Sequence, residues 1–98
     1  MRSDTHKESK EMEVLVLNEH GLHARPSARF VATAKKFESE VWVQKDNLRV
    51  DGKSIMGMLT LAAGPGTKLL ITTHGTDAVQ ASHALEQLFL TEQSMEVS

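Results

Sequence analysis

Apolar side chains recur along the chain with two periods, and the alternation between them marks the predicted strands and helices. Residues 12–17 form a β-branched apolar run of strand length that ends in a polar stretch. Residues 24–37 then have helical periodicity, with apolar side chains at Phe30, Val31, Ala34 and Phe37. Pro26 is tolerated only in the first turn of a helix, so this helix must begin within a residue or two of His23.

The middle of the chain predicts a β-hairpin followed by a short helix. Apolar residues alternate with polar ones over residues 41–43 and 48–50, and the turn formers Asp46 and Asn47 lie between these segments. Ser54 is suited to cap the helix that follows. The dense apolar set of that helix consists of Ile55, Met56, Met58 and Leu59.

The last third of the chain predicts a fourth strand and a final helix. Residues 67–75 have strand composition and follow a Gly-Pro-Gly break. Thr76 or Asp77 can cap the final helix, and Gln80 stands three residues beyond Asp77, as in a capping box. This helix is expected to end near Thr91. Its predicted buried stripe consists of Ala78, Ala81, Leu85, Leu88 and Phe89.

The resulting order is β-α-β-β-α-β-α, with mostly half-polar strands, which favours a single antiparallel sheet with helices on one face. The predicted class is α+β: a four-stranded antiparallel sheet covered on one face by three helices. A length of 98 residues suits one domain with one modest core. We expect the domain to span residues 12–91. Residues 1–11 have too few apolar side chains to offset the loss of conformational entropy on ordering, so we expect them to form a disordered tail. Residues 92–98 are expected to form a C-terminal tail.

Composition narrows the classes of function. The absence of cysteine excludes disulfides, thiolate chemistry and cysteine-ligated zinc, and it suits a reducing compartment, so we expect a cytoplasmic protein. No apolar run approaches the roughly 18 residues that span a bilayer, and the N-terminus has no signal pattern, so membrane insertion is not expected. A net charge of -2 gives no support for nucleic acid as a partner.

Two short motifs are rejected as ligand sites. Residues 52–54 read Gly-Lys-Ser, as at the end of a phosphate-binding P-loop, but Asn47 stands where the first glycine of that loop belongs. His20 and His23 are three residues apart, yet no third ligand stands at a matching spacing. We therefore expect neither a nucleotide nor a metal, and no cofactor.

His23 is the candidate for chemistry because a helix is expected to begin beside it. At an N-cap, the free backbone N–H groups of Ala24 and Arg25 and the positive end of the helix dipole would favour an anion at its ring. A neutral ring nitrogen can attack a phosphoryl group, and the guanidinium of Arg25 would then be in reach of the added charge. From the residues alone, a capping histidine beside a solvated arginine is an equal alternative.

Two separated motifs carry a resemblance to a known family. They are GLHARPS at residues 21–27, with an apolar helix after it, and DGKSIMGMLTL from Asp51, followed by GTKLLITTHGTDA and ALEQLF. Over residues 12–90 the chain resembles the HPr family, the histidine-containing phosphocarriers of the bacterial phosphoenolpyruvate-dependent sugar phosphotransferase system. The resemblance implies that enzyme I phosphorylates His23 on Nδ1 and that EIIA proteins receive the group, with Arg25 as the phosphate partner.

The segment KSIMG resembles the regulatory site of HPr proteins that an ATP-dependent HPr kinase/phosphorylase modifies, and the matching residue is Ser54. A phosphate there would place about two negative charges beside an apolar patch and should weaken docking to enzyme I. The docking surface that the resemblance implies consists of Ala24, Ala28, Ile55, Met56 and Leu59. One departure from the family pattern is His20, which stands where the family usually has Asn or Ser.

The leading interpretation is a monomeric carrier for sugar uptake that is no catalyst in its own right, because no general base, metal site or substrate pocket is visible beside the histidine. A paralogue in a regulatory phosphorelay, such as a nitrogen-related branch, would use the same His23 chemistry. The alternative from another class is a regulatory module that acts only through Ser54, for example as the cofactor of a catabolite-control transcription regulator. Such a module would be expected to lack the histidine, and His23 is present.

Overall fold

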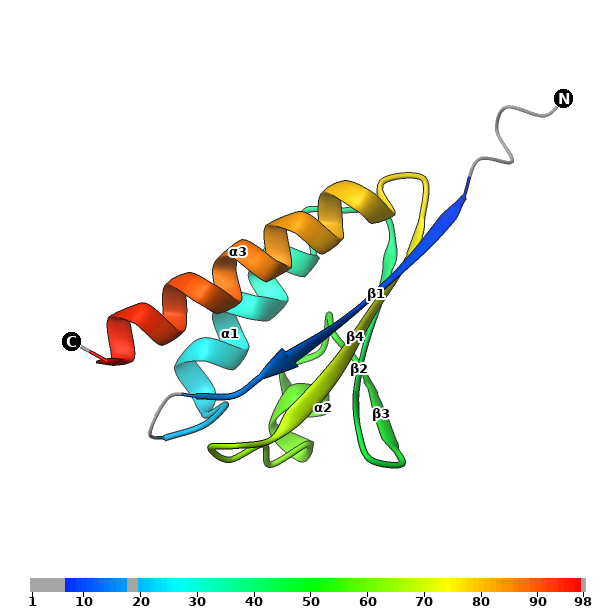
Figure 1. The fold of residues 1–98 in the computed structure, drawn as a ribbon. Coiled ribbons are helices and arrows are strands. Elements are labelled where there is room, and N and C mark those ends of the chain that lie inside the picture. The colour runs from blue at the N-terminus through cyan, green and yellow to red at the C-terminus, as the bar shows by residue number, and fades with distance from the viewer. Residues whose placement is uncertain (1–6, 18–19, 98) are drawn as a thin grey trace, which may run out of the picture.

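Four strands and three helices follow one another in the predicted order β-α-β-β-α-β-α. The structure is a computed structural model that describes residues 7–17 and 20–97. The elements are β1 (Glu8–Leu15), α1 (Ala24–Ala34), β2 (Glu40–Lys45), β3 (Leu48–Asp51), α2 (Ile55–Thr60), β4 (Lys68–Gly75) and α3 (Ala78–Val97). Figure 1 shows the three helices gathered on one side of the sheet, with α3 running along β1. The predicted α+β class is therefore confirmed.

The strands form one antiparallel sheet in the order β1-β4-β2-β3, so that the last strand in the chain lies between the first two. Ile71 of β4 is paired with Met12 on one side and with Val43 on the other. Ile71 and Val43 are buried and Met12 is partly buried, because this face of the sheet lies under the helices. The inner face thus supplies one continuous apolar layer.

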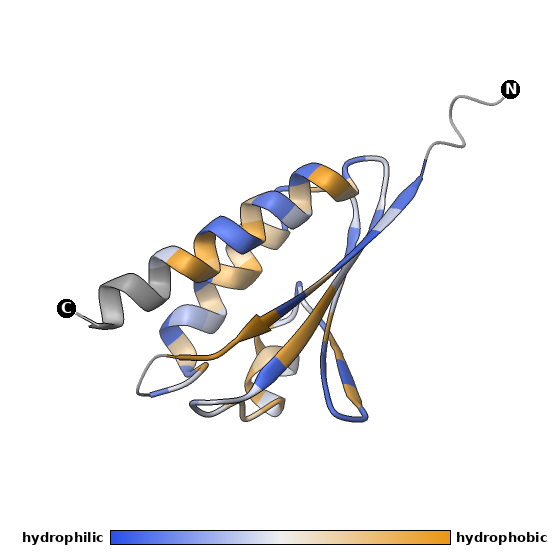
Figure 2. Ribbon diagram, viewed as in Figure 1, coloured by the Kyte–Doolittle hydropathy of each residue, from blue (hydrophilic) through white to orange (hydrophobic). Residues whose placement is uncertain are grey.

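Each helix covers a different part of that apolar layer. α3 packs on β1 and β4, α2 packs on β3, and α1 packs against both other helices. The predicted stripe of α3 is confirmed, since Ala78, Ala81, Leu85 and Phe89 are buried and Leu88 is partly buried. Figure 2 shows the apolar stretches of β1 and β4 lying in the sheet beneath the helices. The core is therefore formed by one face of the sheet, one face of α1 and of α3, and the buried Met58 of α2.

The first strand begins at Glu8, four residues earlier than the Met12 predicted, so residues 8–11 of the expected tail belong to the sheet. The cause is the length of β4, whose backbone offers partners as far as Gly75, the residue that faces Glu8. Polar side chains on an edge strand stay exposed while the backbone pairs, so their polarity does not prevent strand formation. The rest of the predicted tail, residues 1–6, lies outside the described residues.

Two helix ends also differ from the prediction. α3 continues to Val97 instead of ending near Thr91, because the sequence beyond Phe89 contains no Gly or Pro that would break a helix. The expected C-terminal tail is thus helical as far as residue 97. α1 ends at Ala34 instead of Phe37, since the N–H groups of Lys36 and Phe37 bond three residues back and tighten the chain into a 3₁₀-like turn.

The hairpin and the capped short helix are confirmed. Lys45 pairs with Leu48 across the turn, where Asp46 has a φ of 54°, a conformation that Asp tolerates better than most residues. Ser54 caps α2, because its Oγ accepts a hydrogen bond of 3.0 Å from the N–H of Gly57.

Asp77 precedes α3, but its carboxylate binds a different part of the chain. It accepts hydrogen bonds of 2.9 Å from the backbone N–H groups of Glu38 and Ser39, and a further one from the Ser39 hydroxyl. These bonds hold the pKa of Asp77 below its usual value, the Ser39 hydroxyl having the largest effect. The residue therefore ties the start of β2 to the start of α3, and the capping-box pair with Gln80 stays a prediction.

Candidate functional site

His23 occupies the N-cap of α1, within the range of a residue or two that the position of Pro26 predicted for the start of the helix. Its backbone is extended, with φ −87° and ψ −164°, and its carbonyl oxygen accepts the N–H of Ser27 at 3.1 Å. The imidazole is exposed and makes no capping hydrogen bond. A side chain at this place that does not cap the helix has ring nitrogens available to a partner in solution.

The helix start beside His23 presents unpaired backbone donors. Pro26 has no N–H and the N–H of Ser27 is already bonded, so the donors of the first turn are those of Ala24 and Arg25, which find no acceptor among the described residues. No acidic side chain lies in this first turn. The positive end of the helix dipole is therefore not offset locally by a carboxylate, and the site favours an anion.

A tight turn before His23 holds it against another loop. Gly21 is buried with a φ of 68°, and a Cβ at this position would collide with the carbonyl oxygen of Ala63. The N–H of Leu22 donates to that same oxygen at 2.8 Å, and the buried Ser27 hydroxyl lies 3.4 Å from the carbonyl oxygen of Leu22. Ala63 thus positions the histidine from a distant part of the chain, and the sequence contains no signal for this role of a backbone carbonyl.

Arg25 lies two residues after His23, in the first turn of α1, and is exposed. Its side chain has no hydrogen-bond or ion-pair partner among the residues that the structure describes. A guanidinium that is not engaged elsewhere can turn toward an anion at the helix start, because it carries five N–H donors on a flexible stem. Its role as phosphate partner stays a prediction.

His20 lies beside His23. The sequence showed only that His20 stands where the family usually has Asn or Ser, and it did not show whether the two rings meet. The two ring centroids are 5.9 Å apart and the ring planes stand at 80° to each other. Within the described part of the chain, no group of three or more His, Asp or Glu side chains comes close enough to hold a metal ion. The pair is therefore an exposed imidazole couple at the helix start.

Ser54 and an exposed apolar patch lie on α2, next to α1. Ile55, Met56 and Leu59 are 44%, 73% and 38% exposed. Ala24 and Ala28 of α1 are exposed as well, and the two helices pack against each other. Met58, by contrast, is fully buried, so the apolar set predicted for this helix divides between the surface and the core.

The Gly-Lys-Ser segment has a structural role. The N–H of Gly52 donates to the Val41 carbonyl at 2.7 Å, and the Lys53 ammonium donates to the carbonyl oxygen of Phe37 at 2.8 Å. Lys53 therefore links the end of α1 to the loop before α2, a use of the lysine that differs from phosphate binding in a P-loop.

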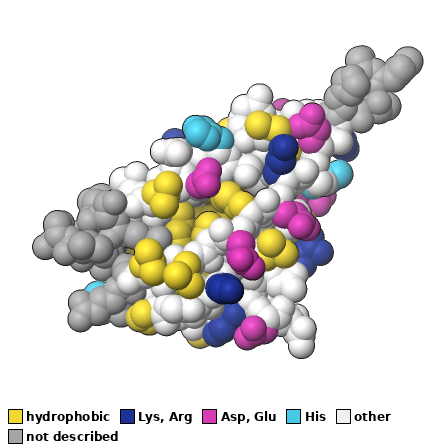
Figure 3. Space-filling model, in the orientation of Figure 1, with side chains coloured by type: hydrophobic (Ala, Val, Ile, Leu, Met, Phe, Trp, Pro, Cys, Tyr) yellow, Lys and Arg dark blue, Asp and Glu magenta, His cyan; other side chains and the backbone are white. Residues whose placement is uncertain are grey.

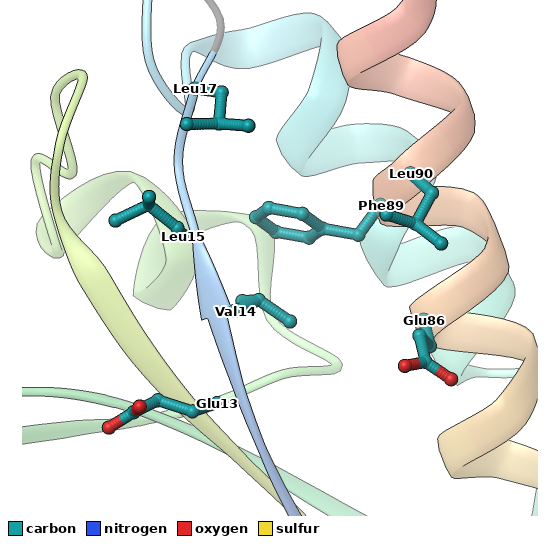
Figure 4. Close-up of a pocket in the computed structure, with 7 residues that line it drawn as sticks. All are labelled: Glu13, Val14, Leu15, Leu17, Glu86, Phe89 and Leu90. Atoms are coloured by element: carbon teal, nitrogen blue, oxygen red, sulfur yellow. The ribbon is translucent and has the colours of Figure 1, made fainter.

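A shallow apolar groove lies between β1 and α3, away from the residues predicted for chemistry. Its lining consists of Glu13, Val14, Leu15, Leu17, Glu86, Phe89 and Leu90. Figure 4 shows Phe89 reaching from α3 toward β1, and Figure 3 shows apolar side chains gathered between these two elements. The groove contains no imidazole or guanidinium group, so it is not formed by the residues predicted for chemistry at the start of α1.

Among the described residues, no helix is both long and apolar enough to cross a membrane.

Comparisons with known proteins bear on the family. Residues 10–91 match the family described as the PTS HPr component phosphorylation site. Phosphocarrier protein HPr of Neisseria meningitidis is 51% identical over 73 residues, which cover 74% of this chain and 82% of that protein. The HPr-like protein Crh of Halalkalibacterium halodurans is 44% identical over 75 residues, which cover 76% and 89%. HPr-C-His from Thermoanaerobacter tengcongensis has a crystal structure with a TM-score of 0.82 and 42% identity, covering 87% of this chain and 96% of that one.

The matched region includes the turn at Gly21, the helix start at His23 and the cap at Ser54. The same fold, a four-stranded antiparallel sheet with three helices, is shared with the solved HPr structure. The chain therefore belongs to the HPr family of phosphocarrier proteins.

Proposed function

We propose that this chain accepts a phosphoryl group on His23 from phosphorylated enzyme I and passes it to EIIA proteins for sugar uptake. The observation that carries the proposal is the exposed His23 ring at the N-cap of α1, where it makes no capping bond. The free N–H groups of Ala24 and Arg25 support it further, since an anion bound at this helix start would find donors already in place.

The chemistry is a transfer between two carriers. The lone pair of the neutral ring nitrogen Nδ1 forms the N–P bond while the bond from phosphorus to enzyme I breaks, and the other ring nitrogen keeps its N–H. The phosphoryl oxygens then lie near the helix amides and within reach of Arg25. In the transfer to an EIIA protein, a nucleophile of that protein forms the new bond to phosphorus while the N–P bond to His23 breaks, so His23 is the leaving group.

The exposure of the site suits a carrier better than a catalyst. His23 lies on the surface at a helix end, so both partners can approach the same phosphoryl group in turn. A small and weak interface allows such an exchange, because a tightly bound complex would retain the carrier. We propose that the chain acts as a cytoplasmic monomer and that Ala24, Ala28, Ile55, Met56 and Leu59 form the docking surface.

A second candidate function is regulation through Ser54. The favouring observation is that Ser54 caps α2 directly before the exposed Ile55 and Met56, so a phosphate would add charge to the edge of an apolar surface. An HPr kinase/phosphorylase would supply the modification, and a catabolite-control regulator would read it. A paralogue in a regulatory phosphorelay, such as a nitrogen-related branch, would keep the His23 chemistry and change only the partners, whereas a module that serves a transcription regulator would act through Ser54 alone.

One labelling experiment tests the carrier function. The protein is mixed with enzyme I and phosphoenolpyruvate that carries labelled phosphate, and the label is tested for lability in acid, as phosphohistidine requires. We expect acid-labile label on the wild type and none on His23→Ala, which should keep its circular dichroism spectrum because the side chain is exposed. Label that persists in His23→Ala would contradict the assignment.

A second labelling experiment tests the regulatory site, with an ATP-dependent kinase and labelled ATP in place of enzyme I and phosphoenolpyruvate. Acid-stable label on the wild type that is absent in Ser54→Ala would support phosphorylation at Ser54.

A further inference from the structure

We infer that His20 is a second phosphoryl-binding residue, whose ring N–H donates a hydrogen bond to the phosphoryl group carried by His23. This inference rests on the proposed function of His23. It starts from the edge-to-face pair of imidazoles, whose centroids lie 5.9 Å apart. An aromatic pair in water would gain little from this arrangement when both rings are exposed, so packing alone is a weak reason for it.

The backbone between the two histidines explains why they meet. Gly21 adopts a φ of 68°, and the N–H of His23 donates to the carbonyl oxygen of Gly21 at 3.1 Å, which closes a tight turn around Leu22. The N–H of Leu22 is held by Ala63 at 2.8 Å. The chain therefore turns sharply between His20 and His23, and the bond from Leu22 to Ala63 holds this turn in place. The backbone conformation thus brings the two rings together.

The proposed site has room for another donor. A phosphoryl group has three oxygens, each able to accept more than one hydrogen bond. The donors already identified are the N–H groups of Ala24 and Arg25 and the Arg25 guanidinium, and all of these belong to α1. His20 belongs to the segment before the helix. It would supply a donor from outside the helix, from the ring that the turn places beside His23.

Imidazole is suited to this task in either charge state. The neutral ring has one N–H and the protonated ring has two, so a donor is always present. A hydrogen bond to an anionic oxygen is stronger than one between neutral groups. His20 makes no hydrogen bond with any residue in the described ranges 7–17 and 20–97, so none of these residues occupies its ring N–H.

The consequence concerns the lifetime of the phosphorylated carrier. We expect the hydrogen bond from His20 to be stronger in phospho-His23 than in the transition state for hydrolysis, so its removal should speed the spontaneous loss of the group. We expect the loss to be about tenfold faster, which is the usual effect of one hydrogen bond to a charged group.

Two substitutions separate the donor from the shape of the ring. His20→Phe keeps a planar ring beside His23 but removes the N–H, whereas His20→Gln removes the ring but keeps an N–H donor. His83→Phe, at an exposed histidine of α3, is the matched control. Each protein is phosphorylated with enzyme I and labelled phosphoenolpyruvate and freed of enzyme I. Loss of label at neutral pH and the ³¹P chemical shift of the phosphohistidine are then measured.

We expect His20→Phe to lose its label about tenfold faster and to show a displaced ³¹P signal, while His20→Gln and His83→Phe stay close to the wild type. Equal lifetimes for His20→Phe and the wild type would overturn the inference, as would a His20→Gln protein that is as labile as His20→Phe. A wild type that takes no label would overturn the proposed function instead. Label on His23→Ala that disappears when His20 is also replaced would make His20 an acceptor and overturn both.

Discussion

The N–H of Leu22 donates a hydrogen bond of 2.8 Å to the carbonyl oxygen of Ala63, which joins the turn before α1 to the loop after α2. Leu22 directly precedes His23, so this bond places the imidazole relative to the neighbouring helix. The position of the reactive side chain thus depends on a residue in a loop much further along the chain.

Gly21→Ala should damage both stability and phosphoryl transfer. The substitution forces a side chain into the left-handed region and into the Ala63 carbonyl, so we expect a loss of about 2 kcal/mol or more in the free energy of unfolding. Urea denaturation and the rate of labelling by enzyme I measure the two effects. Gly64→Ala is the control, because no atom lies within 4 Å of its added Cβ, and equal losses in both variants would contradict the argument.

Arg25→Ala should slow phosphoryl transfer without affecting stability. The side chain is exposed, so its removal should change the free energy of unfolding by less than about 0.5 kcal/mol. The loss of a guanidinium beside the phosphoryl group should slow labelling about tenfold. Timed labelling with limiting enzyme I measures the rate, and Lys36→Ala, just beyond the other end of α1, controls for charge. An unchanged rate in Arg25→Ala would remove this residue from the site.

Substitutions at Ser54 can separate its capping role from the effect of added charge. Ser54→Ala removes the acceptor for the Gly57 N–H and should cost about 1 kcal/mol of stability. Ser54→Asn and Ser54→Asp both keep a capping oxygen, but only the second adds a negative charge. We therefore expect slower labelling by enzyme I in Ser54→Asp alone. Equal rates in the Asn and Asp variants would argue against charge-based regulation at this patch.

Acid should weaken the clasp that Asp77 forms with Glu38 and Ser39. The pKa of Asp77 is lowered in the folded protein, chiefly by the Ser39 hydroxyl, so the unfolded state binds the proton more readily. The stabilisation is therefore present above the unfolded pKa of about 3.9 and is lost as the pH falls through the lower folded value. Urea denaturation of wild type and Asp77→Asn between pH 6 and the acid limit, roughly pH 2.5, tests this.

We expect the variant to be less stable than the wild type at pH 6 and the difference to shrink as the solution becomes more acidic. Asp46→Asn, which removes a carboxylate from the hairpin turn, is the control for net charge. If the difference in the free energy of unfolding between wild type and Asp77→Asn is constant over the whole pH range, the hydrogen bonds of Asp77 to Glu38 and Ser39 do not depend on the charge of the carboxylate.

Much of the candidate site could be predicted because its signals are local. Pro26 is tolerated only in the first turn of a helix, and this local constraint places the start of α1 within a residue or two of His23. Ser54 and the hairpin turn at Asp46 were predicted for the same reason. Met58 could not be separated from Met56 by pattern, because the face that a short helix buries depends on its neighbours.

The sequence by itself determined the number, order and type of the elements, since hydrophobic period and turn chemistry act over a few residues. Tertiary structure decided where β1 begins, because the pairing of residues 8–11 requires the backbone of β4. It also decided that His20 and His23 share a corner of the molecule, because the turn between them is anchored on Ala63. These features depend on partners far apart in the chain, and no local pattern records which residues will meet.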